Sequence, residues 1–66
     1  MSDTEAMVTQ AMMRKMWYAY REVHLLDYQT SRKTLADLTR NVAKRLGVSE
    51  EEATEQMLAK FKVGNK

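Results

Sequence analysis

The chain contains no cysteine and no proline, only two glycines and a single histidine among its 66 residues. Without cysteine, neither a disulfide nor a thiolate metal site can form. One histidine is too few for a structural zinc site, and the absence of proline argues against a linker. We therefore expect no metal and no cofactor, and a fold that depends on side-chain packing.

Long hydrophobic runs are also missing. No apolar run approaches the roughly 18 residues that a membrane-spanning helix requires. The first five residues are polar and acidic, unlike a secretory signal. Hydrophobic residues make up 44% of the chain and charged residues 30%, a composition typical of an ordered soluble domain. These features predict a cytoplasmic protein without a membrane partner.

The short length limits how much surface the chain can bury. Residues 1–66 are enough for one helical domain, and a chain of this size buries only about 60% of the surface that its unfolded form exposes. Folds below about 70–80 residues are usually stabilised by disulfides, metals, very good packing or a second subunit. Since disulfides and metals are excluded, packing and oligomerisation remain.

Helical periodicity dominates the first half of the chain. From Thr4 to about Tyr28 there is neither glycine nor proline, and apolar residues recur at spacings of three and four, which predicts one long helix over about residues 3–28. Ser2 and Glu5 fit a capping box at its start. A broad apolar stripe comprises Val8, Met12, Met13, Met16, Trp17, Ala19, Tyr20, Val23 and Leu26. A second, narrower stripe on the opposite side comprises Met7, Ala11, Tyr18 and Leu25.

Two shorter helices are predicted after the first. The segment Tyr28–Ser31 ends in threonine and serine, weak helix formers that cap well, which indicates a break. The alternative is one bent helix that continues to Leu46. The second helix is expected over about residues 32–46 and ends at Gly47, which can adopt the left-handed conformation. A capping box at residues 49–52 starts the third helix, expected over about residues 50–63.

The expected fold class is all-α: a three-helix chain with a long N-terminal helix followed by a helix–glycine turn–helix corner. The broad stripe is expected to pack against Leu35, Leu38, Val42, Leu46, Met57, Leu58 and Phe61. The second stripe then needs another partner, which predicts a homodimer or an obligate complex with a protein. Aromatic residues near arginine are typical of interface hot spots. The predicted partner-binding residues are Met7, Ala11, Arg14, Tyr18, Arg21 and Leu25.

Residues 38–58 resemble a helix-turn-helix. Ala43 precedes Gly47 by four positions, and Leu46 and Val48 flank the glycine. The resemblance implies a small dimeric DNA-binding regulator. The alternative is a corner that only packs, because the third helix carries glutamates at residues 50–52 and 55. Whether or not the motif reads DNA, basic residues on the second helix are candidates for phosphate contacts: Lys33, Arg40, Lys44 and Arg45.

No set of residues predicts catalysis. The chain has no glycine-rich phosphate loop and no nucleophile paired with a base, so we expect neither a catalytic residue nor a small-molecule substrate. The six methionines are interpreted as core or adaptable interface residues rather than as metal ligands. The preferred hypothesis is a non-enzymatic adaptor, inhibitor or regulator, of the kind that phages and mobile elements encode. The second hypothesis is the DNA-binding regulator.

Overall fold

The computed structural model describes residues 3–62, and this part of the chain contains three α-helices and no strand. Helix α1 spans Asp3–His24, α2 spans Arg32–Leu46 and α3 spans Glu50–Met57. A 3-10 turn, η1 (Gln29–Ser31), precedes α2, and a π-helical turn, η2 (Leu58–Lys62), follows α3. The predicted all-helical class with three helices is thus confirmed. Within residues 3–62, no helix is both long and apolar enough to cross a membrane.

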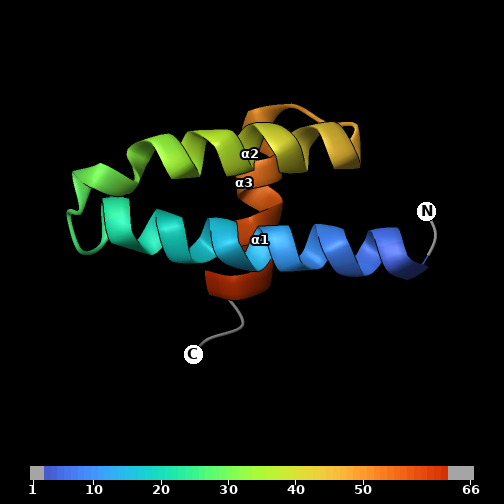
Figure 1. The fold of residues 1–66 in the computed structure, drawn as a ribbon, viewed down its shortest axis with the longest axis horizontal. Coiled ribbons are helices and arrows are strands. Elements are labelled where there is room, and N and C mark those ends of the chain that lie inside the picture. The colour runs from blue at the N-terminus through green and yellow to red at the C-terminus, as the bar shows by residue number, and fades with distance from the viewer. Residues whose placement is uncertain (1–2, 63–66) are drawn as a thin grey trace.

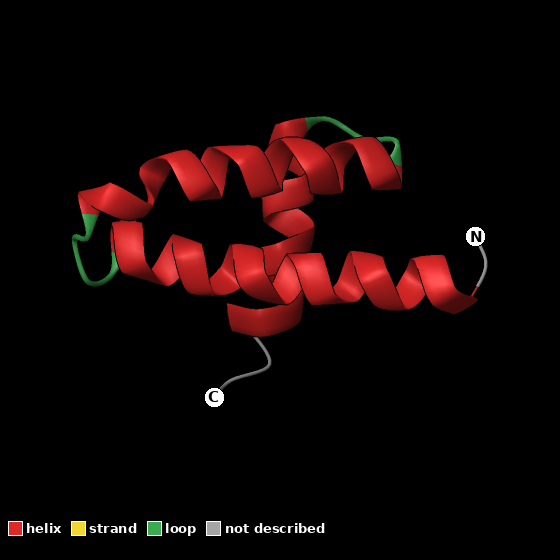
Figure 2. Ribbon diagram, viewed as in Figure 1, coloured by secondary structure: helices red, strands yellow, loops and turns green. Residues whose placement is uncertain are grey.

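Helices α1 and α2 run antiparallel and lie side by side, and α3 crosses both of them (Figure 1). The same view coloured by secondary structure shows that short loops join the helices (Figure 2). Each helix therefore contacts the other two, and the core forms where α3 crosses the pair. Its buried members are Met13, Met16, Trp17, Val42, Ala43, Ala53 and Met57.

Several predicted core residues border this cluster. Partly buried side chains pack against it from α1, from α2, from the α2–α3 corner and from η2: Met12, Tyr20, Leu35, Leu38, Leu46, Val48, Leu58 and Phe61. The predicted broad stripe of α1, however, does not coincide fully with the buried face of the helix. Val8 is 39% exposed and Leu26 is 54% exposed, whereas Thr9 is buried. The buried face of α1 is therefore rotated toward Met13 and Trp17, which lie in one cluster with residues of α2 and α3.

Helix α1 ends at His24, four residues earlier than the sequence predicted. Asp27 adopts a left-handed backbone with φ of 59°, and Tyr28 is extended, so the helical path cannot continue. The Leu26 N–H donates to the Arg21 carbonyl oxygen at 2.9 Å, and the Tyr28 N–H donates to that of Glu22 at 2.6 Å. Leu26 lies in this turn, which is why the helical period does not bury it. The alternative of one helix continuous to Leu46 is wrong.

Ser31 connects the first two helices through a side-chain hydrogen bond, whereas its residue type had suggested a helix cap. Its hydroxyl makes no capping bond to α2 and instead donates to Glu22 Oε2 at 2.6 Å. The Glu22 carboxylate therefore lies near the start of α2, where negative charge is favoured by the helix dipole. This bond fixes the C-terminal part of α1 against the N-terminal end of α2.

The corner between α2 and α3 is formed as predicted. Gly47 is left-handed, with φ of 70°, and the Val48 N–H donates to the Ala43 carbonyl oxygen at 3.0 Å. Ser49 Oγ accepts a bond from the Glu52 N–H at 3.0 Å and caps α3. α3 gives way to η2 at Leu58, so the third helix is not one regular α-helix. The cap expected at Ser2 and the helix end expected at residue 63 lie outside the described residues.

Candidate functional site

The second stripe of α1 faces solvent. Met7 is 72% exposed, Tyr18 52% and Leu25 59%, and Ala11 is exposed as well. Arg14 and Arg21, the other two predicted partner-binding residues, are also exposed and lie on the same side of the helix. We name the set of Met7, Ala11, Arg14, Tyr18, Arg21 and Leu25 the outer seam. The chain's own helices do not cover the outer seam, as the two-sided pattern of α1 predicted.

The outer seam has the spacing of a coiled-coil contact line. Its six residues are separated by four, three, four, three and four positions, which is the alternation that keeps side chains facing one neighbouring helix. Leu25 follows the last residue of α1, but its N–H still donates to the Arg21 carbonyl oxygen at 2.8 Å. The helical register therefore extends to the end of the seam.

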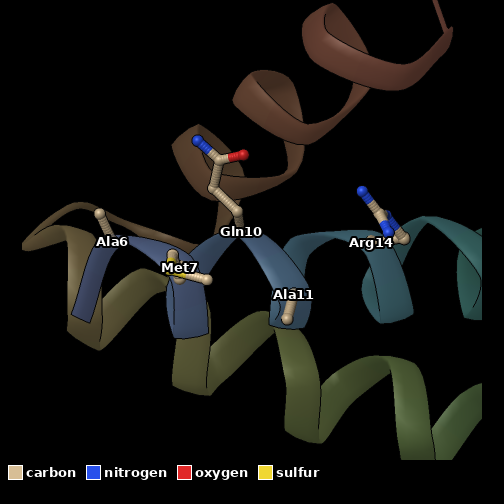
Figure 3. Close-up of a pocket in the computed structure, with 5 residues that line it drawn as sticks. All are labelled: Ala6, Met7, Gln10, Ala11 and Arg14. Carbon is tan, nitrogen blue, oxygen red and sulfur yellow. The ribbon is translucent and has the colours of Figure 1, made fainter. Parts of the chain in front are cut away.

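A shallow groove lies at the N-terminal half of the outer seam, lined by Ala6, Met7, Gln10, Ala11 and Arg14. All five belong to α1, and Figure 3 shows the short Ala11 side chain between the longer side chains of Met7 and Arg14. Residues 7, 10, 11 and 14 have the i, i+3, i+4, i+7 arrangement that surrounds a hole in knobs-into-holes packing. The groove can therefore accept one side chain from a helix lying along α1.

The charge along the outer seam is positive. Arg14, Lys15 and Arg21 are exposed on this part of α1. Within residues 3–62, the Arg14 guanidinium has neither a hydrogen bond nor an ion pair. The Arg21 guanidinium lies 5.9 Å from the centre of the Trp17 ring, in cation–π range. The neighbouring carboxylate of Glu22 accepts a bond from the Ser31 hydroxyl, which directs it toward the start of α2.

The aromatic side chains of α1 separate as predicted. Trp17 is 7% exposed, and its ring stacks on that of Tyr20 with centroids 6.1 Å apart and planes 17° apart. The Tyr20 ring in turn lies 4.5 Å from the His24 ring. This row follows the inner side of the helix, whereas Tyr18 lies on the outer seam. Tyr18 is therefore the aromatic residue of α1 that is available to a partner.

The predicted phosphate-contacting residues of α2 are all exposed, but they do not form one cluster. Lys44 and Arg45 line a second shallow groove together with Asn41 and Met12 of α1. Lys33 precedes Lys44 by eleven residues, or about 16 Å along a helix. Arg45 lies about 100° around the helix from Lys44, away from the face of Lys33 and Arg40. Lys33, Arg40 and Lys44 thus share one face of α2 but are spread along it, and Arg45 lies on a different face.

The helix that would read DNA in a helix-turn-helix is acidic here. Exposed carboxylates lie along α3, from Glu50, Glu51, Glu52 and Glu55. Ala53 and Met57 of the same helix are fully buried, so the helix presents its acidic side outward. The corner resembles a helix-turn-helix in its glycine turn and capped helix. Its outer surface is negatively charged, however, and is therefore repelled by phosphates.

The described interior holds no polar constellation. Among residues 3–62, no three His, Asp or Glu side chains lie close enough to hold a metal ion, and every buried polar side-chain atom has a hydrogen-bond partner. The buried hydroxyls of Thr9 and Thr39 donate to the carbonyl oxygens of Glu5 and Leu35, at 2.8 and 2.7 Å. These polar groups are used within the helices, so the candidate sites are surfaces.

Comparison of the chain with protein-family models, with curated proteins and with solved structures gave no match. The outer seam of α1 and the basic residues of α2 are therefore the features from which a function is inferred.

Proposed function

We propose that this protein is a non-enzymatic helical interaction module that acts by binding a protein partner through the outer seam. The observation that carries the proposal is the exposure of Met7, Tyr18 and Leu25 in one line along α1. Fully burying one such large apolar side chain stabilises a complex by about 1.5–3 kcal/mol. A chain of this kind acts as an adaptor, inhibitor or regulator by occupying a surface of its partner.

The arrangement of these residues supports the proposal more than their number does. Single exposed apolar side chains are common on soluble proteins and need no explanation. Here the exposed apolar residues follow a coiled-coil spacing, with a side-chain-sized groove at Ala11 and an aromatic residue flanked by two arginines. Aromatic and arginine side chains are the residue types that dominate binding energy at interfaces.

Substitutions on the outer seam test the proposal. A carboxylate placed among apolar contacts is desolvated without a partner, so we expect Tyr18→Glu and Leu25→Glu each to abolish capture of partner proteins from the native host. The same variants are examined by analytical ultracentrifugation, in case the wild-type chain assembles with itself. Tyr28→Glu is the matched control, because Tyr28 is 57% exposed but is extended and follows the end of α1, outside the helical register of the seam. Unchanged partner capture and unchanged mass in both seam variants would refute the proposal.

A second candidate is a small DNA-binding regulator that uses the α2–α3 corner. The observation in its favour is the groove beside Lys44 and Arg45, which joins two cations to the Asn41 amide near the Gly47 turn. The acidic surface of α3 weighs against it.

A further inference from the structure

We propose that the partner of the outer seam is an amphipathic helix that lies along α1 and carries two carboxylates seven residues apart, opposite Arg14 and Arg21. This inference rests on the proposed protein-binding function and specifies the chemistry of the partner.

The length and spacing of the outer seam call for a helix. Met7 and Leu25 are separated by 18 residues, or about 27 Å along a helix axis. A side-chain row with alternating spacings of three and four is matched along its whole length by another helix running beside it. The groove at Ala11 supplies one hole for a side chain of that helix. A strand or a compact loop would contact only part of the row.

The charge of the outer seam calls for acidic groups on that helix. Arg14 and Arg21 alternate with the apolar residues, so a helix that covers Met7, Tyr18 and Leu25 also desolvates both guanidiniums. Removing an unpaired charge from water is unfavourable, whereas a carboxylate that accepts two parallel bonds from arginine offsets much of this penalty. Arg14 and Arg21 are seven residues apart, so the matching carboxylates recur at the heptad spacing.

A second copy of this chain does not meet these requirements. Two outer seams facing each other bring together both copies of Arg14, Lys15 and Arg21, whereas the seam itself contains no acid and the acids of α1 beside it are Asp3 and Glu22. The Glu22 carboxylate already accepts the Ser31 hydroxyl. The acidic side of α3 would supply charge, but its exposed residues are glutamates, which do not cover the apolar residues of the seam. The observations therefore favour a different protein.

Selection from a library of displayed helical peptides tests this inference directly. The peptides have four heptads with leucine at the a and d positions, except that two positions seven residues apart vary among Glu, Gln and Lys. We expect wild-type protein to enrich Glu at both variable positions. We expect a protein with both Arg14→Glu and Arg21→Glu to enrich Lys instead. Lys33→Glu is the matched control, since Lys33 is an exposed cation of α2 and should leave the Glu preference unchanged.

Affinity measurements on the enriched acidic peptide add a quantitative test. Arg14→Glu places like charges opposite each other and should weaken binding by at least about tenfold, with Arg14→Gln intermediate and Lys33→Glu within about twofold. Far-ultraviolet circular dichroism verifies that each variant is folded.

Enriched peptides without a preference for Glu would overturn the inference but would not contradict the proposed protein-binding function. Failure of all peptides to bind would also overturn it, and partner capture by the seam variants would then decide the proposed function by itself. A wild-type dimer that Tyr18→Glu dissociates would identify a second copy as the occupant and overturn it too.

Discussion

At the scale of single residues, burial separates side chains that look alike in the sequence. Met16 and Met57 are fully buried, whereas Met7 is 72% exposed. Both kinds of methionine lie at helical spacings among other apolar residues, so their difference comes from which side of α1 the other helices cover. Methionine suits both positions, because its flexible thioether fills irregular core space and adapts to binding surfaces.

This difference predicts unequal effects of the same truncation. Met16→Ala should lower the free energy of unfolding by about 2–5 kcal/mol, because it leaves a cavity where α3 crosses the helix pair. In a domain of this size, such a loss is enough to unfold much of the protein. Met7→Ala should change the free energy of unfolding by less than about 0.5 kcal/mol. Urea denaturation followed by circular dichroism measures both, and equal losses would contradict the assigned core.

At the scale of elements, the ends of the helices depend on different signals. The corner after α2 uses a glycine and a serine in their expected roles. The end of α1 uses Asp27, a residue that adopts the left-handed conformation less readily than glycine but more readily than most others. The Asp27 carboxylate accepts a bond from Gln29 Nε2 at 2.6 Å, which supports this turn. The end of α2 could therefore be predicted from the glycine and the serine that follow it. The end of α1 could not, because no residue after it is a strong stop signal.

Substitutions of Gly47 at the corner test the backbone conformation alone, without a steric clash of the new side chain. A Cβ at Gly47 would meet nothing within 4 Å, so Gly47→Ala costs only the left-handed backbone conformation, about 1–2 kcal/mol. Gly47→Asn should cost less, because asparagine tolerates this conformation. Differential scanning calorimetry should rank melting temperatures as wild type, then Gly47→Asn, then Gly47→Ala. An alanine variant as stable as wild type would contradict the left-handed cap.

At the scale of the whole molecule, charges are segregated although the net charge is only +2. Cations lie along the outer seam and on α2, and four glutamates lie on α3. A nucleic acid that approached the α2–α3 corner would meet both signs of charge. A protein helix along α1 would meet the cationic seam, which lies on the side of α1 opposite to its buried residues. α3 crosses α1 and α2 (Figure 1), and its buried residues belong to the core.

Charge segregation predicts the outcome for DNA. We expect no measurable binding to random duplex DNA at low salt, since the carboxylates of α3 repel phosphates at the surface that would enter a groove. Fluorescence anisotropy at low and moderate salt measures this. Binding that falls steeply with salt and weakens in Arg40→Glu and Lys44→Glu would instead support the DNA-binding regulator. Lys60→Glu, an exposed cation outside α2, is the control for a general loss of charge.

By itself, the sequence determined the local features of this protein. Helical spacing without strand alternation predicted the three helices, and Gly47 and Ser49 predicted the corner. The second stripe of α1 predicted a surface that residues 3–62 leave exposed. Each of these depends on residues close together in the chain, where propensity, capping and periodicity act.

Only the tertiary structure decided which side of α1 is covered and where α1 ends. Packing of the helices buries Thr9 and Met13 and leaves Val8 exposed, and the Ser31 side chain bonds to Glu22 across the turn after α1. The same bond, between residues nine positions apart, directs the Glu22 carboxylate toward the start of α2. These features come from packing between helices and from pairing of side chains across a turn, which no local pattern specifies.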